Sequence, residues 1–329
     1  MILAGDIGGT RARLALYEPR SDGPQRVAAQ QYHSSEYPSL QAVVAQFLTE
    51  HPWSVSAACL GIAGPVVDGT VKTPNLPWTV EARSLARQLS LEKVLLINDL
   101  EASAWSLAAL SDSDLVTLSR GDGSGRSAHR ALIAAGTGLG EVGLFYDGHV
   151  HRPLAGEGGH ADFSPRTEEE TELLVKLRGL YGHVSMERVL SGPGLSNIYN
   201  FLRDSGFASE SGEVVRLMRE RDPVAVISEY GLNGECALCV RSLDIFVSIY
   251  GAAAGNLALR FAALGGLYVG GGIAPRILSK LSEGGFMDAF VDKGRMRPFL
   301  KAMPVHVVRV PDVGVLGAAR CAARCTAIA

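Results

Sequence analysis

The stretch that decides the fold is Ile2-Leu3-Ala4-Gly5-Asp6-Ile7-Gly8-Gly9-Thr10-Arg11-Ala12-Arg13-Leu14-Ala15-Leu16-Tyr17. Its first residues are apolar and predict a buried strand over 2–5, while the alternation of apolar residues over 11–17 predicts a second strand. The glycine pair and Thr10 lie between these runs, where a tight turn is needed. The stretch is therefore predicted to form an antiparallel β-hairpin with a glycine turn at its tip.

The same pattern returns about 130 residues further along the chain. A strand is predicted over 131–135, a turn at Gly136-Thr137-Gly138-Leu139-Gly140, and another strand over 142–146. Two such units suggest that the chain consists of duplicated halves. Its length of 329 residues fits two domains of about 150 residues each.

Composition excludes several classes of protein. The 31 Lys and Arg against 34 Asp and Glu give a net charge of −3, and no Lys/Arg-rich tract is present, so nucleic acid is not an expected partner. Five scattered cysteines indicate a reduced, cytoplasmic protein, in which Cys236 and Cys239 have a structural role. The most apolar region, 248–274, contains Asn256, Arg260 and seven glycines, so no membrane span is expected.

The 38 glycines are the unusual feature of the composition, and they lie in short clusters. Backbone N–H groups of a glycine turn can approach an anion without obstruction by side chains. The turn at 8–10 can thus hold phosphate oxygens, with Asp6 facing the metal that screens them, and the turn at 136–140 can clamp further phosphates. A third cluster, Gly270-Gly271-Gly272-Ile273, follows a predicted strand, precedes a predicted helix over 275–281, and offers bare backbone to an adenine ring. One such motif alone is more simply a hairpin turn, but one nucleotide held by three segments needs all three.

Neither of two common nucleotide motifs is present. No Gly-Lys-Ser/Thr sequence of a P-loop occurs, and the late glycine cluster lacks the spacing of a dinucleotide-binding fold. Arg11 and Arg13 share the other face of the second strand and can add positive charge beside the first turn.

Asp99 lies where a short apolar strand over 94–97 meets a predicted helix, the position at which ligands approach open α/β sheets. It is either the cap of that helix or a general base that accepts the proton of a sugar hydroxyl during phosphoryl transfer. Asn98 beside it offers a donor and an acceptor to a neighbouring hydroxyl.

Glu157, His160 and Glu187 are further candidates for sugar contacts. Glu157 and His160 flank a glycine pair and can bracket vicinal hydroxyls, or they are ordinary surface residues of a loop. Glu187 falls in a predicted helix over 185–189, where a contact with the helix dipole would also explain it.

Taken together and in this order, these motifs resemble the bacterial glucokinase family, the ATP-dependent, hexokinase-related enzymes of the sugar kinase, chaperone and actin superfamily. The resemblance runs from Gly5 to about Gly317. It is carried by Gly5-Asp6-Ile7-Gly8-Gly9-Thr10, Ile97-Asn98-Asp99, Gly136-Thr137-Gly138-Leu139-Gly140, Gly156-Glu157-Gly158-Gly159-His160, Glu187-Arg188-Val189-Leu190-Ser191-Gly192-Pro193-Gly194 and Gly270-Gly271-Gly272-Ile273-Ala274-Pro275-Arg276.

The resemblance implies a role for each matching position. Asp99 is implied as the base that takes the proton of the glucose 6-hydroxyl. The implied ring contacts are Asn98, Glu157, His160 and Glu187, and the implied phosphate clamps are Gly8, Gly9, Thr10, Gly136, Thr137 and Gly138. The implied adenosine motif is Gly270, Gly271, Gly272 and Ile273, and Asp6 is implied to lie near Mg²⁺ through water, with no direct metal ligand.

The resemblance also implies an architecture: two ribonuclease-H-like α/β domains of mixed sheets flanked by helices, with an interdomain cleft that closes on the sugar. The expected small domain is 1–110 with about 302–329, and the large domain is 111–301. Family members are commonly cytoplasmic homodimers. One departure is Arg11, which stands where many relatives have Asn.

The predicted function is therefore MgATP-dependent phosphorylation of D-glucose to glucose 6-phosphate. The alternatives are a kinase for mannose, fructose or an amino sugar, a kinase that takes polyphosphate as donor, and a non-catalytic sugar sensor. The intact adenosine motif argues against polyphosphate, and the presence of Asp6, Thr10 and Asp99 argues against the sensor.

Overall fold

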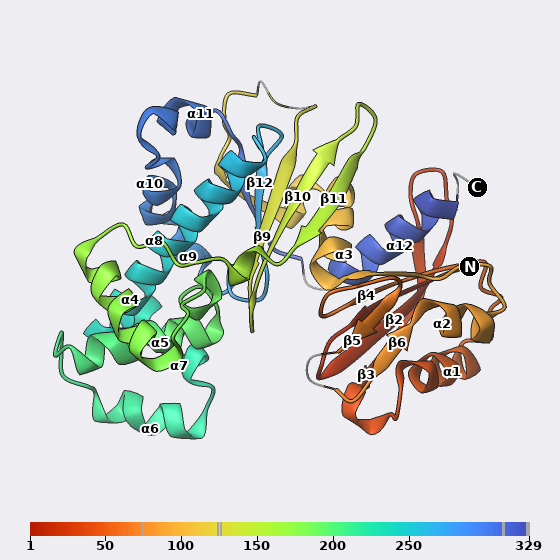
Figure 1. Ribbon diagram of the computed structural model, residues 1–329, viewed down its shortest axis with the longest axis horizontal. Helices are drawn as coiled ribbons and strands as arrows, with labels where there is room; N and C mark the ends of the chain where they lie inside the picture. Colours follow the sequence, from red (N-terminus) through yellow and green to blue (C-terminus); the bar gives the residue numbers. More distant parts are fainter. Residues whose placement is uncertain (74–75, 124, 126, 311–312, 327–329) are drawn as a thin grey trace. The chain divides into compact units, whose positions relative to one another are not determined.

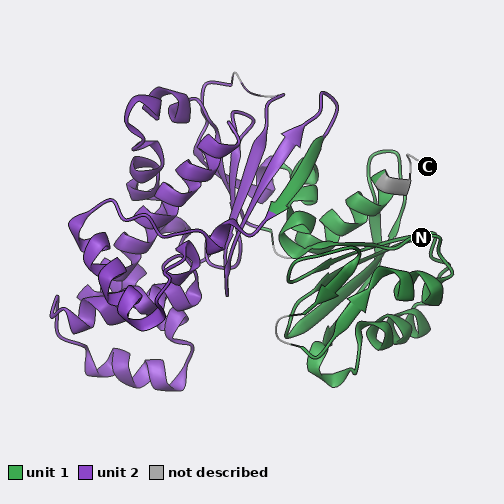
Figure 2. Cartoon of the chain, in the orientation of Figure 1, with its two compact units in different colours: residues 1–111, 151–155, 310–329 green, residues 112–150, 156–309 purple. Residues whose placement is uncertain are grey.

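The computed structural model describes residues 1–73, 76–123, 125, 127–310 and 313–326 (Figure 1). Residues 311–312 and 327–329 of the expected small domain lie outside this range. The chain forms two compact units (Figure 2): unit 1 comprises residues 1–111, 151–155 and 310–329, and unit 2 comprises 112–150 and 156–309.

Unit 1 is built on a five-stranded sheet. Its strands, in order across the sheet, are β3 (Gln25–His33), β2 (Arg11–Glu18), β1 (Ile2–Ile7), β4 (Ala57–Ile62) and β7 (Leu95–Asn98). The predicted hairpin is confirmed, since β1 and β2 pair antiparallel from Ile2↔Tyr17 to Ile7↔Ala12. Strand β4 is parallel to both β1 and β7, so the carboxyl ends of all three lie at one edge of the sheet.

Helices cover both faces of this sheet. They are α1 (Leu40–Glu50), α2 (Ala82–Leu89), α3 (Asp99–Ser106) and α12 (Val313–Thr326), with the small hairpin β5 (Thr70–Lys72) and β6 (Thr79–Glu81) and the 3₁₀ turns η1 (Ser34–Glu36) and η2 (Leu107–Ala109). The buried stripe of α1, Leu40, Val43, Val44 and Phe47, packs in one core cluster with the β1 residues Leu3 and Ile7. On the other face α12 packs against α3. The approach is so close that a Cβ on Gly317 would overlap the Ala102 carbonyl oxygen, so a glycine is needed there.

The second sheet has six strands. In order they are β11 (His151–Gly156), β10 (Leu139–Tyr146), β9 (Arg130–Ala135), β12 (Leu267–Gly270), β13 (Val305–Val308) and β8 (Leu115–Ser119). Strands β9 and β10 form the second predicted hairpin, paired antiparallel from Ala135↔Leu139 to Arg130↔Leu144. Strand β12 is parallel to both β9 and β13. The expected recurrence of the hairpin is thus confirmed, and in both sheets parallel strands lie beside it.

The helices of unit 2 form one large apolar core with this sheet. They are α4 (Glu168–Tyr181), α5 (Gly192–Asp204), α6 (Gly212–Glu220), α7 (Pro223–Leu232), α8 (Ala237–Arg260), α9 (Leu278–Ser282), α10 (Gly285–Val291) and α11 (Arg297–Lys301), with 3₁₀ turns η3 (Asp112–Asp114), η4 (Gly158–His160), η5 (Met186–Arg188) and η6 (Gly294–Met296). Among the described helices, α8 is the one long and apolar enough to cross a membrane. Yet 72% of its most apolar window is buried inside the protein, as expected of a core helix.

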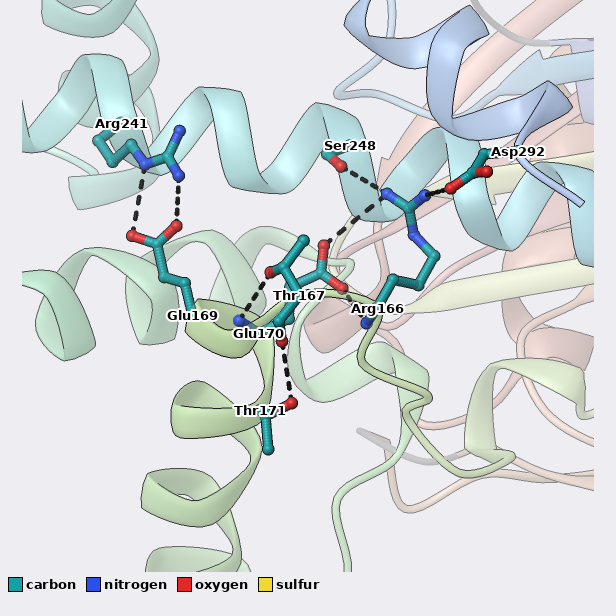
Figure 3. A network of polar contacts seen from close by, with 8 residues as sticks. All are labelled: Arg166, Thr167, Glu169, Glu170, Thr171, Arg241, Ser248 and Asp292. Atoms are coloured by element: carbon teal, nitrogen blue, oxygen red, sulfur yellow. Dashed lines mark hydrogen bonds and ion pairs between the residues drawn. The ribbon is translucent and has the colours of Figure 1, made fainter.

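A polar network fixes the beginning of α4 against α8 (Figure 3). The Arg166 guanidinium donates to the Ser248 hydroxyl at 2.8 Å and to the Asp292 carboxylate at 3.1 Å. Its backbone N–H donates to the buried Glu170 carboxylate at 2.7 Å, and Glu169 pairs with Arg241. The opposite charges of this network pair with one another, while the buried Nε of Arg166 has no hydrogen-bond partner among the described residues.

The structure differs from two sequence-based expectations. The helix expected over 275–281 begins only at Leu278, because residues 271–277 form consecutive turns. The helix expected over 185–189 is the single 3₁₀ turn η5. Both segments lie beside glycine clusters, where the backbone follows tertiary contacts rather than local helix propensity.

Candidate active site

The first glycine turn of unit 1 is held by a buried serine that the sequence analysis missed. Within the turn, the N–H of Gly8 donates to the carbonyl of Arg11 at 2.9 Å. The Ser34 hydroxyl donates to the Gly8 carbonyl at 3.0 Å, and the Ser34 N–H donates to the Thr10 carbonyl at 3.1 Å. Two turn carbonyls are therefore bonded to Ser34, which leaves the turn better suited to an anion.

Asp6 lies on β1 just before this turn and faces Arg13 across the hairpin. The two residues are register partners, and the guanidinium lies 3.5 Å from the carboxylate. Arg13 also donates to Gln31 at 3.2 Å. The positive charge expected from Arg13 is thus shared with Asp6 and Gln31 rather than directed at phosphate alone.

Asp99 lies at the same sheet edge as the first turn. The register Ile7↔Ile62↔Asn98 places the ends of β1 and β7 two strand spacings apart, about 10 Å by ordinary sheet geometry. Of the two interpretations of Asp99, the helix cap is wrong: Asn98 is the cap of α3, and Asp99 is its first helical residue.

Asn98 organises this corner of the molecule. Its side-chain oxygen accepts from the N–H groups of Leu100 at 2.9 Å and Glu101 at 3.4 Å, and its amide donates to the Gly64 carbonyl at 3.2 Å. Asn98 therefore ties the end of β7 to the turn after β4, and it presents Asp99 at the beginning of α3.

Burial raises the pKa of Asp99 above its ordinary value, and hydrogen bonds from the Leu100 N–H and the Asn98 side chain oppose that rise. A carboxylate whose pKa is raised is a stronger base than an ordinary carboxylate. The environment of Asp99 is therefore suited to proton abstraction.

In unit 2, the second glycine turn is held from two sides. The N–H of Gly136 donates to the Gly138 carbonyl, and the N–H of Gly192 donates to the Gly136 carbonyl, both at 2.8 Å. The Glu187 carboxylate accepts from the N–H of Leu139 at 2.8 Å. Glu187 is thus fixed by the turn itself rather than by the dipole of a helix.

The loop that carries Glu157 and His160 lies against the same turn. Glu157 precedes η4, and the His160 N–H donates to the Glu157 carbonyl at 3.0 Å, with both side chains exposed. A Cβ on Gly159 would lie 2.1 Å from the carbonyl oxygen of Leu139, so only glycine permits this approach. The structure thereby brings Glu157, His160 and Glu187 around one end of the second turn.

The third glycine cluster, 270–273, packs against Ala135, the residue that precedes the second turn. Gly271 has a φ of +84°, and its absent Cβ would lie 2.3 Å from the Ala135 carbonyl oxygen. The N–H of Ile273 donates to that same carbonyl at 3.3 Å. Nearby, the buried Tyr250 hydroxyl contacts both Ala135 and Gly270. No sequence signal marked Tyr250, because it lies in the apolar run 249–255 of a long helix.

Three glycines in these clusters are not required by the fold. A Cβ on Gly136 or Gly272 would have no heavy atom of the described residues within 4 Å, and one on Gly8 would meet Arg11 at an ordinary 3.4 Å. None of the three has a φ in the left-handed region.

Among the residues that the structure describes, no group of three or more His, Cys, Asp or Glu could hold a metal ion. The candidate residues thus form two sets. Unit 1 carries Asp6, Gly8, Gly9, Thr10, Asn98 and Asp99, and unit 2 carries Gly136, Thr137, Gly138, Glu157, His160, Glu187, Gly270, Gly271, Gly272 and Ile273.

The mixed sheets flanked by helices and the paired glycine hairpins define a protein with the fold of the sugar kinases. The solved structure of a glucokinase from an Antarctic psychrotroph is similar, with a TM-score of 0.86 and 32% identity over 98% of each chain. A ROK family glucokinase from Streptomyces griseus, solved with glucose and AMPPNP, has the same fold, with a TM-score of 0.64 at 20% identity over 98% of this chain and 99% of that one.

The chain belongs to the glucokinase family, whose model matches residues 3–325. The glucokinase of Trichormus variabilis is 42% identical to it over 340 residues, which cover 98% of this chain and 99% of that protein. The family resemblance drawn from the sequence motifs is thereby confirmed.

Proposed function

We propose that this protein catalyses the ATP-dependent phosphorylation of D-glucose to glucose 6-phosphate. Membership of the glucokinase family over nearly the whole chain supports the activity. The observation that carries the mechanism is Asp99, a carboxylate with a raised pKa at the sheet edge that also holds the first glycine turn.

Asp99 is proposed as the general base. The oxygen of the glucose 6-hydroxyl attacks the γ-phosphorus of ATP, the bond from that phosphorus to the β-γ bridging oxygen breaks, and the hydroxyl proton passes to the Asp99 carboxylate. The products are glucose 6-phosphate and ADP, and Asp99 then releases its proton to solvent. Asn98 keeps Asp99 in place through the cap of α3.

The proposed sugar contacts are those that the family motifs imply. The sugar ring hydroxyls are contacted by Asn98, Glu157, His160 and Glu187. Carboxylates accept hydroxyl protons, while imidazole and amide groups can also donate. Because Glu187 accepts from the Leu139 N–H, a sugar held by Glu187 is held next to the second phosphate turn.

The nucleotide is proposed to lie on bare backbone. Gly8, Gly9 and Thr10 and then Gly136, Thr137 and Gly138 take the phosphates, and Gly270, Gly271, Gly272 and Ile273 take the adenosine. Support comes from Gly8, Gly136 and Gly272, where the fold itself leaves room for a side chain.

Mg²⁺ is proposed to accompany ATP and to be held by Asp6 through water. Asp6 fits this role because its carboxylate is partly exposed beside the phosphate turn, and its pairing with Arg13 suits an outer, water-mediated contact. The ion would supply charge that stabilises the transferring phosphoryl group. We further propose that the protein acts in the cytoplasm as a homodimer, as is common in the family.

The test is glucose-dependent release of ADP, measured with and without Mg²⁺ against a panel of glucose, mannose, fructose and glucosamine. The proposal expects the highest kcat/KM with glucose and loss of activity when Mg²⁺ is chelated. A higher kcat/KM with another sugar would assign a different hexose kinase, and binding of glucose without turnover would assign a sugar sensor.

A further inference from the structure

The two glycine turns of unit 2 that are assigned to the nucleotide begin where two neighbouring strands stop pairing. The parallel ladder between β9 and β12 runs from Leu267↔Ala131 to Gly270↔Ala134 and ends there. Beyond that point β9 enters the second phosphate turn, and β12 enters the adenosine turn. Ladder hydrogen bonds set the relative position of parallel strands, so a different contact must set it beyond the last pair.

Tyr250 supplies one such contact, in addition to the backbone hydrogen bond from Ile273 to Ala135. Its hydroxyl oxygen accepts from the N–H of Ala135 at 3.2 Å, and the same hydroxyl donates to the carbonyl of Gly270 at 3.2 Å. A phenol can do both at once because it carries one proton and free lone pairs. The hydroxyl thus replaces a ladder bond across the two strand ends.

The ring that carries this hydroxyl is itself held firmly. Tyr250 comes from the core helix α8 and has no exposed surface. Its ring packs edge-on against Phe246 and Phe286, with centroid separations of 6.0 and 5.7 Å. Burial raises the pKa of Tyr250 above its ordinary value, so the hydroxyl keeps its proton and remains a donor at neutral pH.

Ala135 is the residue through which the two turns meet. Its N–H is bonded to Tyr250, and its carbonyl accepts from Ile273 of the adenosine turn. The next residue, Gly136, opens the phosphate turn. Loss of the Tyr250 hydroxyl would leave a buried N–H and a buried C=O without this partner at the position where both turns originate.

We infer that Tyr250 is a positioning residue for the nucleotide, which sets the spacing of the second phosphate turn from the adenosine turn so that both fit one molecule of ATP. The inference rests on the proposed function for the identity of that nucleotide. It requires no contact between Tyr250 and ATP, since the hydroxyl acts through the backbone of Ala135 and Gly270.

The test compares Tyr250→Phe with Tyr199→Phe. Tyr199 lies on α5, and its side chain is also buried in the core of unit 2. Its hydroxyl donates a single, partly buried hydrogen bond to Glu210 at 3.2 Å. For Tyr250→Phe we expect a KM for ATP raised ~tenfold, with kcat changed less. Calorimetric binding of glucose alone should stay within about twofold of the wild type, because Glu187 and Gly159 contact Leu139 and not the backbone groups that Tyr250 binds.

The thermal midpoint should fall in both variants, whereas the KM for ATP should rise in Tyr250→Phe alone. An unchanged KM for ATP in Tyr250→Phe, or a parallel rise in Tyr199→Phe, would overturn the inference. Should the wild-type protein bind ATP in calorimetry but phosphorylate no hexose, the proposed function fails, and the ATP affinities of the two variants still decide the role of Tyr250. Wild-type protein that binds no ATP would refute both.

Discussion

The two units use the same strand arrangement for different chemistry. In unit 1 the order β2-β1-β4-β7 joins a hairpin to two parallel strands, and in unit 2 the order β10-β9-β12-β13 does the same. Both sheets carry a glycine turn after the first strand of the hairpin. A second glycine turn follows β12 in unit 2, whereas the carboxylate Asp99 follows β7 in unit 1.

The two edges also differ in how they are supported. Asn98 holds Asp99 from the adjacent position in the chain. In unit 2 the supports come from a distance, since Tyr250 lies 115 residues from Ala135 and Glu187 lies 48 residues from Leu139. The helix that carries a side chain can fix its position, whereas a glycine turn has no regular structure of its own and is held by contacts from distant parts of the chain.

The largest expected effect tests the side-chain edge. Replacement Asp99→Asn should lower kcat by about 10²–10⁴-fold because the amide cannot accept the proton, while calorimetric glucose affinity should change little. Glu101→Gln is the matched control, since Glu101 lies in the same first turn of α3 and burial raises its pKa as well. A normal kcat in Asp99→Asn would show that Asp99 is not the general base.

The backbone edge is tested by two neighbouring glycines. Gly272→Ala should fold normally yet raise the KM for ATP by about tenfold, because its new methyl group would meet the nucleotide and not the protein. Gly271→Ala should lower the thermal midpoint as well, since its φ is +84° and its Cβ would meet Ala135. Unchanged ATP kinetics in Gly272→Ala would break the assignment of this turn to adenosine.

The local support of Asp99 is tested by Asn98→Ala. Removal of the cap should cost about 1–2 kcal/mol of stability by denaturant unfolding and should lower kcat, because Asp99 loses its fixed position. Ser39→Ala removes the cap of α1, where the hydroxyl accepts from the Ala42 N–H, away from the site. It should cost similar stability with no change in kcat; equal kcat in both variants would show that the cap does not orient the base.

The smallest expected effect is that of Asp99 on the stability of the wild-type protein. Its folded pKa is raised by burial, so the folded state binds a proton more tightly than the unfolded state, and ionised Asp99 lowers stability as the pH rises above its ordinary pKa. Asp99→Asn should therefore be at least as stable as wild type at pH 7, with less advantage at pH 4. Thermal melts at both pH values test this, and a variant less stable at pH 7 would contradict the environment inferred for the carboxylate.

Much of the site could be predicted from local sequence. The hairpins were evident because apolar alternation and glycine pairs are short-range signals, and Asp99 stood out at a strand end. The edge strand β3 was missed, since most of its side chains are exposed and its sequence lacks a buried alternation. The helix expected before Leu278 failed because contacts with Ala135 hold that backbone in turns.

By itself, then, the sequence determined the repeated hairpin, the residues at its glycine turns and the membership of the glucokinase family, because each is a local pattern or a motif of fixed spacing. The tertiary structure alone decided that Asn98 and not Asp99 caps α3, that Ser34 secures the first turn, and that Tyr250 joins the second and third. Ser34 and Tyr250 lie far from their partners in the chain, and Asn98 and Asp99 are alternative caps for one helix. Packing, and not local propensity, therefore decides these contacts.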